Sequence, residues 1–308
     1  MMEKLPETPE QMVTKVRVAI RRIGQGITLV AIFFLIRELY EQSGEIRNWR
    51  PTIAQFFLMS VLALAYAAAL LILAFNWLTI LSALIKDPLP KGPVLLSYTS
   101  TQIAKYIPGN FLHFVGRHAY LKNTGLSHKP IATASIYEII SLPVAAIIAI
   151  CLAIPFVDSG RVGSWERADR TAIAGLIVVA LTVVLAVIWY QCNTRAWKSA
   201  SIVISRATGF MLFQGLVFSA LLYAVSGSFV VLAIPVAIMS WLVGFVTIGA
   251  PGGIGVREAL LINMLDSASA NENVLIAALL FRVITTVGEI VLYAFGNVFL
   301  AKPNSRGE

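Results

Sequence analysis

Two Pro-Gly pairs interrupt long apolar stretches of this 308-residue chain, one within 107–110 and one within 250–255. An arginine follows each pair, Arg117 after the first and Arg257 after the second. Proline removes a backbone donor and glycine loosens the backbone, so a helix is expected to break at both places. In hydrocarbon a broken backbone is tolerated only where protein or a watery cavity covers it. The two pairs therefore predict interrupted helices that meet near the middle of a membrane, an arrangement typical of transporters.

The composition is that of a membrane protein. Hydrophobic residues make up 58% of the chain, charged residues make up 13%, and the mean hydropathy is +0.80. Soluble domains carry about 25% charged residues. The polar segment before the first apolar run ends in a basic cluster of Lys15, Arg17, Arg21 and Arg22, and no small-residue cleavage site follows the run at 23–36. We interpret that run as an anchor helix and not as a signal peptide.

The apolar runs predict an all-α integral membrane protein with six full transmembrane helices and two re-entrant broken-helix hairpins. The spans are expected at 19–42, 53–85, 131–156, 171–191, 209–227 and 276–300, and the hairpins at 94–121 and 229–265. A single transmembrane domain then covers 19–300, with an N-terminal segment at 1–18 and a tail at 301–308.

The loop charges set the orientation of these spans. Basic residues precede the first span and flank the first hairpin, and Arg195, Lys198 and Arg206 are expected in a basic loop, whereas 266–274 is acidic. Since basic loops stay cytoplasmic, both termini are predicted to be cytoplasmic, in a multi-pass protein of the inner membrane. The net charge of +8 is then explained by anionic lipid headgroups and implies no nucleic acid.

This topology makes the two halves inverted repeats, at 53–156 and 209–300. Each repeat consists of a span, a hairpin and a second span, and the two begin on opposite sides of the membrane. Pro108 lies 30 residues before Glu138, and Pro251 lies 31 residues before Arg282. Inverted repeats with broken helices place a site at their interface that is reached from either side in turn.

Ionisable residues inside the predicted spans are candidates for function, because burying a charge there costs several kcal/mol. They are Lys105, Arg117, Glu138, Arg257, Glu258, Arg282 and Glu289. Acids and bases nearly balance, so we predict that Arg117 pairs with Glu138 and Glu258 with Arg282. Glu138, Glu258, Arg282 and Glu289 are the predicted gating network. The alternative is that the pairs only fix helix register and touch no substrate.

The broken helices also predict an anion site, because free amides at a helix start attract anions and an arginine one turn away adds charged hydrogen bonds. The predicted substrate-binding residues are Lys105, Pro108, Gly109, Asn110, Arg117, Pro251, Gly252, Gly253, Gly255 and Arg257. No Lys-Ser/Thr follows the glycines, so the motif is not a nucleotide loop.

The remaining residue types suggest structural roles. Cys151 and Cys192 are predicted to be buried free thiols, and the three histidines lack partners at metal-ligand spacing. We expect no metal and no cofactor. The tryptophans, Trp77 among them, are predicted to be interfacial anchors. Small residues at 63–69 predict close helix packing.

The motifs resemble those of the lysylphosphatidylglycerol synthase/flippase membrane-domain family. The second motif, 251–258 with Arg257 and Glu258, is closely similar to the family pattern, and Phe281-Arg282 followed by Gly288 resembles its closing helix. The first motif, Gln102-x-x-Lys105-x-x-Pro108-Gly109, is looser, since Asn110 stands where a second glycine is common. The resemblance covers about 20–300 and implies a stand-alone member without the soluble aminoacyl-transferase domain.

These features suggest three functions. The leading hypothesis is a flippase-like transporter, not an enzyme, for a phosphate-bearing lipid, either a phospholipid or a polyisoprenyl-phosphate-linked lipid. The alternative is a non-transporting subunit that docks a glycosyltransferase or a lipid-modifying enzyme. An integral enzyme is the weakest of the three, since no nucleophile–base pair and no acidic metal motif is present in the sequence. A homo-oligomer is left open.

Overall fold

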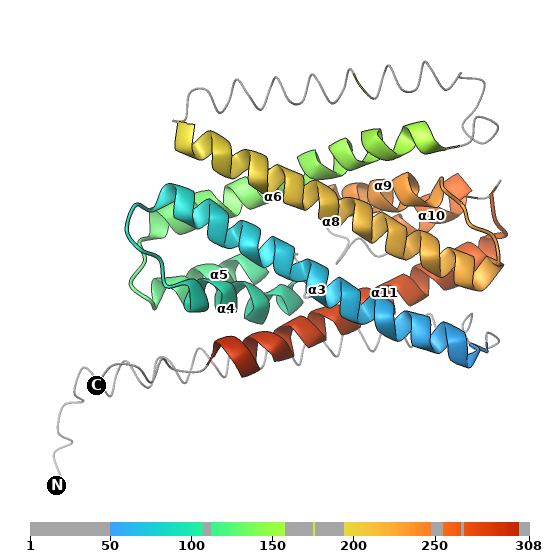
Figure 1. Ribbon diagram of the computed structural model, residues 1–308, viewed down its shortest axis with the longest axis horizontal. Coiled ribbons are helices and arrows are strands. Elements are labelled where there is room, and N and C mark those ends of the chain that lie inside the picture. The colour runs from blue at the N-terminus through green and yellow to red at the C-terminus, as the bar shows by residue number, and fades with distance from the viewer. Residues whose placement is uncertain are drawn as a thin grey trace, which may run out of the picture.

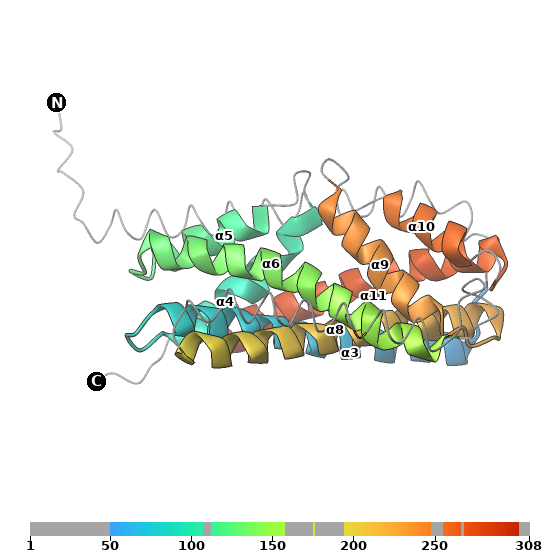
Figure 2. The same ribbon diagram turned by 90° about the horizontal axis from the view of Figure 1, so that it is seen from above.

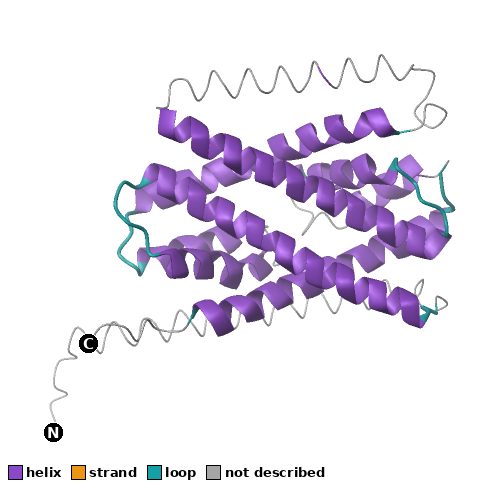
Figure 3. Ribbon diagram, in the orientation of Figure 1, coloured by secondary structure: helices purple, strands orange, loops and turns teal. Residues whose placement is uncertain are grey.

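The computed structural model describes residues 50–106, 112–157, 175, 194–247, 255–265 and 268–301. Most of these residues are helical and none of them forms a strand, as Figure 3 shows. Four of the described helices, at Ile53–Leu84, His128–Phe156, Lys198–Ser226 and Asn271–Leu300, are long and apolar enough to cross a membrane. The prediction of an all-α membrane protein is confirmed at this level. The spans predicted at 19–42 and 171–191 lie outside the described residues, apart from residue 175.

The first half of the described chain begins with α3 (Ile53–Leu84). A capping box starts this helix, because the side chains of Thr52 and Gln55 accept hydrogen bonds from each other's backbone amides. The interrupted segment follows as α4 (Lys91–Thr101), the 3-10 helix η1 (Gln102–Tyr106) and α5 (Leu112–Lys122). The half closes with α6 (His128–Ala153) and the 3-10 turn η2 (Ile154–Phe156).

The second half has the same order of elements. It begins with α8 (Thr194–Ser226), continues with the interrupted segment α9 (Ala233–Val246) and α10 (Val256–Leu265), and ends with α11 (Asn271–Phe295) and the π-helix η5 (Gly296–Leu300). The prediction that this span begins near 209 was wrong, because α8 begins at Thr194. Arg195, Lys198 and Arg206 therefore lie on the helix and not in a loop; no proline or glycine interrupts 194–208.

The interrupted segments lie at opposite ends of the bundle. Figures 1 and 2 both place α4 and α5 toward one end of the long axis and α9 and α10 toward the other. The long helices α3, α6, α8 and α11 run between the two ends. α3 packs on α8 and α11, and α6 packs on α8 and α9.

Side-chain hydrogen bonds and small residues bring the long helices together. Asn76 of α3 donates to the Val203 carbonyl of α8 at 3.0 Å, and Gln55 donates to the Ala224 carbonyl at 2.6 Å. Where α11 crosses α3, a Cβ on Gly288 would lie 2.8 Å from the Tyr66 ring and 3.1 Å from the Ala63 carbonyl oxygen. Only glycine permits so close a crossing, which confirms the close packing predicted for 63–69.

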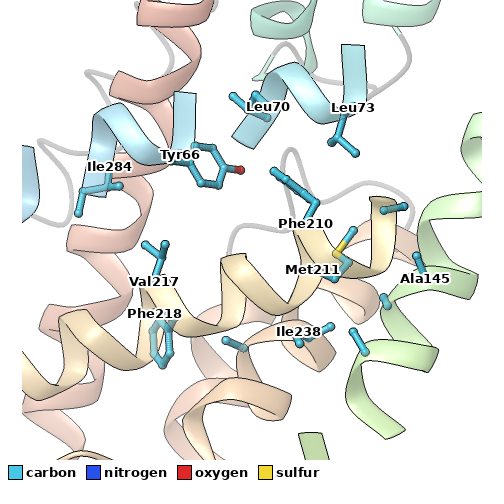
Figure 4. Packing of buried hydrophobic residues seen from close by; sticks show 14 of the residues in the cluster. Tyr66, Leu70, Leu73, Ala145, Phe210, Met211, Val217, Phe218, Ile238 and Ile284 are labelled. Carbon is cyan, nitrogen blue, oxygen red and sulfur yellow. The ribbon is translucent and has the colours of Figure 1, made fainter. Parts of the chain in front are cut away.

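The apolar core continues through both halves. Tyr66, Phe210, Phe218 and Ile284 come from three different helices and belong to one buried cluster, part of which Figure 4 shows. Every charged side chain that is buried in this interior carries an unfavourable desolvation term, so the positions of those side chains are informative.

Candidate functional site

In the described part of the chain, three ion pairs join the interrupted segments to α6 and α11. Arg117 of α5 pairs with Glu138 of α6, Lys105 of η1 pairs with Glu289 of α11, and Glu258 of α10 pairs with Arg282 of α11. The pairs Arg117–Glu138 and Glu258–Arg282 are those that the sequence predicted, and both are confirmed. The Lys105–Glu289 pair was not predicted, although both residues were among the candidates.

Arg117 is the most deeply buried of these charges. Arg117 has no exposed surface, and its guanidinium donates hydrogen bonds to Glu138 and, at 2.7 Å, to Gln102 of η1. Removing a guanidinium from water is expensive unless its donors are satisfied and its charge is compensated. The carboxylate and the amide oxygen therefore hold α5 to both α6 and η1 at this point.

Three aromatic rings surround the same guanidinium. The Tyr98 ring centroid lies 3.8 Å from Arg117 Cζ, and those of Trp77 and Phe114 lie 5.3 and 5.5 Å away. A cation over an aromatic face gains about 2 kcal/mol or more when it is desolvated. Trp77 was predicted to be an interfacial anchor, and this was wrong, because its side chain is fully buried beside Arg117.

The sequence contained a signal for part of this environment. Tyr98, Gln102 and Lys105 follow one another at intervals of four and three residues, which places them on one face of a helix. Tyr98 and Gln102 meet Arg117, and Lys105 meets Glu289. The contribution of Trp77 comes from another helix and had no local signal.

Lys105 and Glu289 differ sharply in exposure. The Glu289 side chain is fully buried, whereas 27% of the Lys105 side chain is exposed. Among the three cations of these pairs, Lys105 is the most accessible, since Arg282 is 17% exposed and Arg117 is 0% exposed. An anion that approaches this group of charges therefore reaches Lys105 most easily.

Glu258 connects the start of α10 to α11. One carboxylate oxygen accepts from Arg282 Nε at 2.7 Å, and the other accepts from the Gly255 backbone N–H at 2.8 Å. Gly255 has a φ of +80°, a left-handed conformation in which glycine avoids the strain of a side chain. The carboxylate thus occupies a backbone donor at a helix start, where the sequence predicted an anion to bind.

The predicted binding residues are only partly within the described chain. Lys105, Arg117, Gly255 and Arg257 are described, and Arg257 is half-buried on α10 next to Glu258. The others, which belong to the two Pro-Gly motifs, lie outside the described residues: Pro108, Gly109, Asn110, Pro251, Gly252 and Gly253.

The described histidines and Cys151 form no metal-binding arrangement, either beside the ion pairs or away from them. His118 and His128 share a hydrogen bond of 2.7 Å where α5 turns into α6; His118 lies outside the four candidate spans, and His128 is the first residue of one of them. Partial burial, and then the neighbouring His128 and Lys122, lower the pKa of His118 below its ordinary value. Cys151 is buried and free, as predicted, while Cys192 lies outside the described residues. Among the described residues no group of three potential ligands could hold a metal ion.

Each of these ion pairs holds opposite charges together in an apolar interior and joins two different helical elements. No family model matches the chain, and a search of curated proteins also gives no match.

Proposed function

We propose that this chain is a flippase-like transporter that moves a phosphate-bearing lipid across the cytoplasmic membrane by alternating access. In this proposal it belongs to the lysylphosphatidylglycerol synthase/flippase membrane-domain family. The observation that carries the proposal is the set of three ion pairs, each of which joins an interrupted segment to α6 or α11.

Ionised side chains within a membrane bundle are expensive, and those that persist generally serve an ion or substrate path. A purely structural bundle is stabilised by apolar packing and small residues, which this chain already has at the α3–α11 crossing. Six additional charges add desolvation cost that a simple anchor does not require. This argument favours a carrier over a passive bundle.

The packing supports the proposed inverted repeats. If α3 is matched with α8, α4 with α9, α5 with α10 and α6 with α11, the contacts of one half recur in the other. For example, α3 packs on α11 just as α8 packs on α6. The ion pairs Arg117–Glu138 and Glu258–Arg282 occupy matched positions with their signs reversed. The cation lies on α5 in the first pair, whereas the anion lies on α10 in the second.

The proposal assigns the headgroup phosphate to Lys105 and Arg257 and to the two Pro-Gly motifs, while the lipid tail stays in the bilayer. Arg117 has no exposed surface in this conformation. Its predicted phosphate contact therefore requires a second conformation, in which its bonds to Glu138 and Gln102 open. Glu138, Glu258, Arg282 and Glu289 form the network that rearranges between the two states.

Reconstituted protein tests the proposal. Purified chain in liposomes should expose a fluorescent phosphatidylglycerol of the inner leaflet to dithionite added outside, faster than in protein-free liposomes. Arg257→Ala should slow this exposure at least tenfold, whereas Lys129→Ala, which removes an exposed charge near the start of α6, should leave it unchanged. A rate equal to that of protein-free liposomes would contradict the proposed function.

The complete burial of Arg117 favours the second candidate, a non-transporting subunit that docks a glycosyltransferase or a lipid-modifying enzyme. In that case the ion pairs fix helix register only. The absence of lipid movement, together with stable co-purification of such an enzyme, is the result that this candidate predicts.

A further inference from the structure

We propose that the outer surface where α3 meets α8 binds an anionic phospholipid of the surrounding bilayer, with Arg206 of α8 holding the lipid phosphate. This lipid stays bound to the protein and is not the transported substrate, so the inference goes beyond the proposed function. The site uses exposed side chains of two long helices and none of the three buried ion pairs.

The two helices run in opposite directions and pack side by side (Figure 1). The hydrogen bonds Gln55–Ala224 and Asn76–Val203 lie 21 residues apart on both helices, so they define one antiparallel register. In that register Thr79 lies opposite residue 200, yet Arg206 Nη1 donates to Thr79 Oγ1 at 3.3 Å. The Arg206 side chain therefore extends toward the start of its own helix, the direction that helical side chains favour.

That direction leads to the basic end of the two helices. Lys198 is the first residue of the candidate span Lys198–Ser226, and Lys86 directly follows the α3 cap residue Ile85. A span of 29 residues is about 44 Å long, whereas the hydrocarbon core is about 30 Å thick. The first turns of α8 therefore have room to extend beyond the hydrocarbon. This places the Arg206 guanidinium near the level of the lipid headgroups.

Within the described part of the chain, Arg206 has a neutral hydroxyl as its partner and no carboxylate. Neither α3 nor α8 contains an acidic residue. Lys86 and Lys198 belong to none of the three described ion pairs either, whereas each cation of those pairs has a carboxylate beside it. The charge that compensates this basic surface is therefore expected from the bilayer.

The chemistry of the surface fits a phosphate. A guanidinium binds phosphate oxygens through parallel, charge-assisted hydrogen bonds, and Arg206 keeps its charge at any physiological pH. Basic residues at this depth attract anionic lipids. A zwitterionic lipid carries a cation of its own, which Lys86 and Lys198 would repel. An anionic headgroup is therefore favoured over a zwitterionic one.

The neighbouring apolar side chains fit the acyl chains of such a lipid. Phe75 and Ile72 lie one and two turns before Thr79 on α3, on the same face of the helix, and both are exposed. An acyl chain that leaves a phosphate at Arg206 toward the membrane centre meets these two side chains. A soluble phosphodiester would lack this contact, so the occupant is a lipid.

Native mass spectrometry of the full chain in detergent measures the binding directly. Phosphatidylglycerol should bind at least tenfold more tightly than phosphatidylcholine with the same acyl chains. Arg206→Gln should weaken the binding of phosphatidylglycerol at least tenfold. Lys129→Gln, which removes an exposed lysine near the start of α6, should change it by less than twofold. Equal affinity of the wild type for the two lipids would overturn the inference.

Two further measurements on the wild type identify the ligand and its position. Glycerophosphoglycerol, the same headgroup without acyl chains, should not displace the lipid, and displacement at similar concentrations would overturn the assignment to a lipid. Phosphatidylglycerol with a photoreactive diazirine in its acyl chain should label the α3 peptide that contains Ile72 and Phe75. Labelling that avoids α3 and α8 would also overturn the inference. Neither measurement depends on the folding of a variant.

The outcomes separate this inference from the proposed function. Arg206→Gln should lose the bound lipid and keep lipid movement in liposomes, whereas Arg257→Ala should keep the bound lipid and lose the movement. Undiminished binding by Arg206→Gln would overturn the inference alone. Loss of lipid movement in Arg206→Gln would place Arg206 in the transport path and would overturn its role in holding a resident lipid. The absence of lipid movement by the wild type would instead contradict the proposed function.

Discussion

At the scale of single residues, the most informative side chain is Arg117. It is a permanent cation without exposed surface, and a carboxylate, an amide oxygen and three aromatic rings share its compensation. An ion pair of this kind gives little net stability relative to a well-packed apolar pair, but breaking it by removing one partner is costly. This asymmetry provides a way to test whether Glu138 depends on Arg117.

We expect Arg117→Met to lower the free energy of unfolding by about 3–5 kcal/mol, because it leaves the Glu138 carboxylate buried beside an apolar chain. Adding Glu138→Gln should recover part of that loss, since the buried negative charge is then removed. Lys122→Met, at an exposed site on the same helix, should change the stability by at most about 0.5 kcal/mol. Thermal unfolding in one detergent measures all three. A single Arg117→Met variant as stable as the control would show that Glu138 does not need this partner.

Residues of this kind could be predicted from the sequence only in part. Arg117 and Glu138 stood out because charged residues are rare in apolar stretches, and their opposite signs suggested a pair. The aromatic enclosure could not be predicted, since Trp77 comes from a helix whose position relative to α5 depends on the whole bundle. The partner of Lys105 was missed for the same reason, as Glu289 lies 184 residues away in the chain.

At the scale of elements, the crossing of α3 and α11 shows how backbone contact sets helix positions. Gly288 lies against Ala63, Tyr66 and Ala67, so the two helices touch through their backbones. Glu289 is the next residue of α11. The position of its carboxylate therefore depends directly on this contact.

Gly288→Val should destabilise the protein by about 1–3 kcal/mol, because its Cβ would lie 2.8 Å from Tyr66 Cδ1 and 3.2 Å from the Ala67 amide nitrogen. Gly209→Ala on α8 is the matched control. A Cβ there meets no atom within 4 Å, so alanine should be neutral or stabilising by up to about 1 kcal/mol. Thermal unfolding would contradict this account of the crossing if both variants shifted in the same direction by similar amounts.

Helix positions were largely predictable, and their ends less so. The ends of α3 follow from the Thr52–Gln55 capping box and from the Lys86-Asp87-Pro88 stop, both of which are local signals. The start of α8 was missed because basic residues were interpreted as a loop, whereas long basic side chains on a helix reach the membrane surface while their backbone stays helical. The 3-10 geometry of η1 had no sequence signal that we recognised.

At the scale of the whole molecule, the two interrupted segments approach the centre from opposite ends of the bundle (Figure 2). The loop between α5 and α6 lies at one end and the turn between α8 and α9 at the other. The loop charges alone predicted that the two interrupted segments lie at opposite ends of the bundle. The order of elements could be predicted because it depends on apolar runs, while the depth of each ion pair could not, since it depends on how eight helices pack in the described part of the chain.

Labelling of single cysteines tests whether the two interrupted segments enter the membrane from opposite sides. In a background with Cys151→Ser and Cys192→Ser, Asn123→Cys should react with a membrane-impermeant maleimide only in inside-out vesicles, and Ser228→Cys only in right-side-out vesicles. Both positions are exposed, so reactivity reports the side of the membrane. Labelling of both from the same side would show that the two segments do not enter from opposite faces.

Arg282 and Glu289 lie seven residues apart on α11, which places them on one face of one rigid helix, two turns from each other. Arg282 holds α10 and Glu289 holds η1. A slide of α11 along its own axis by a single turn, about 5.4 Å, would therefore separate both contacts in the same step. Such a slide would therefore uncouple α10 and η1 from this helix together.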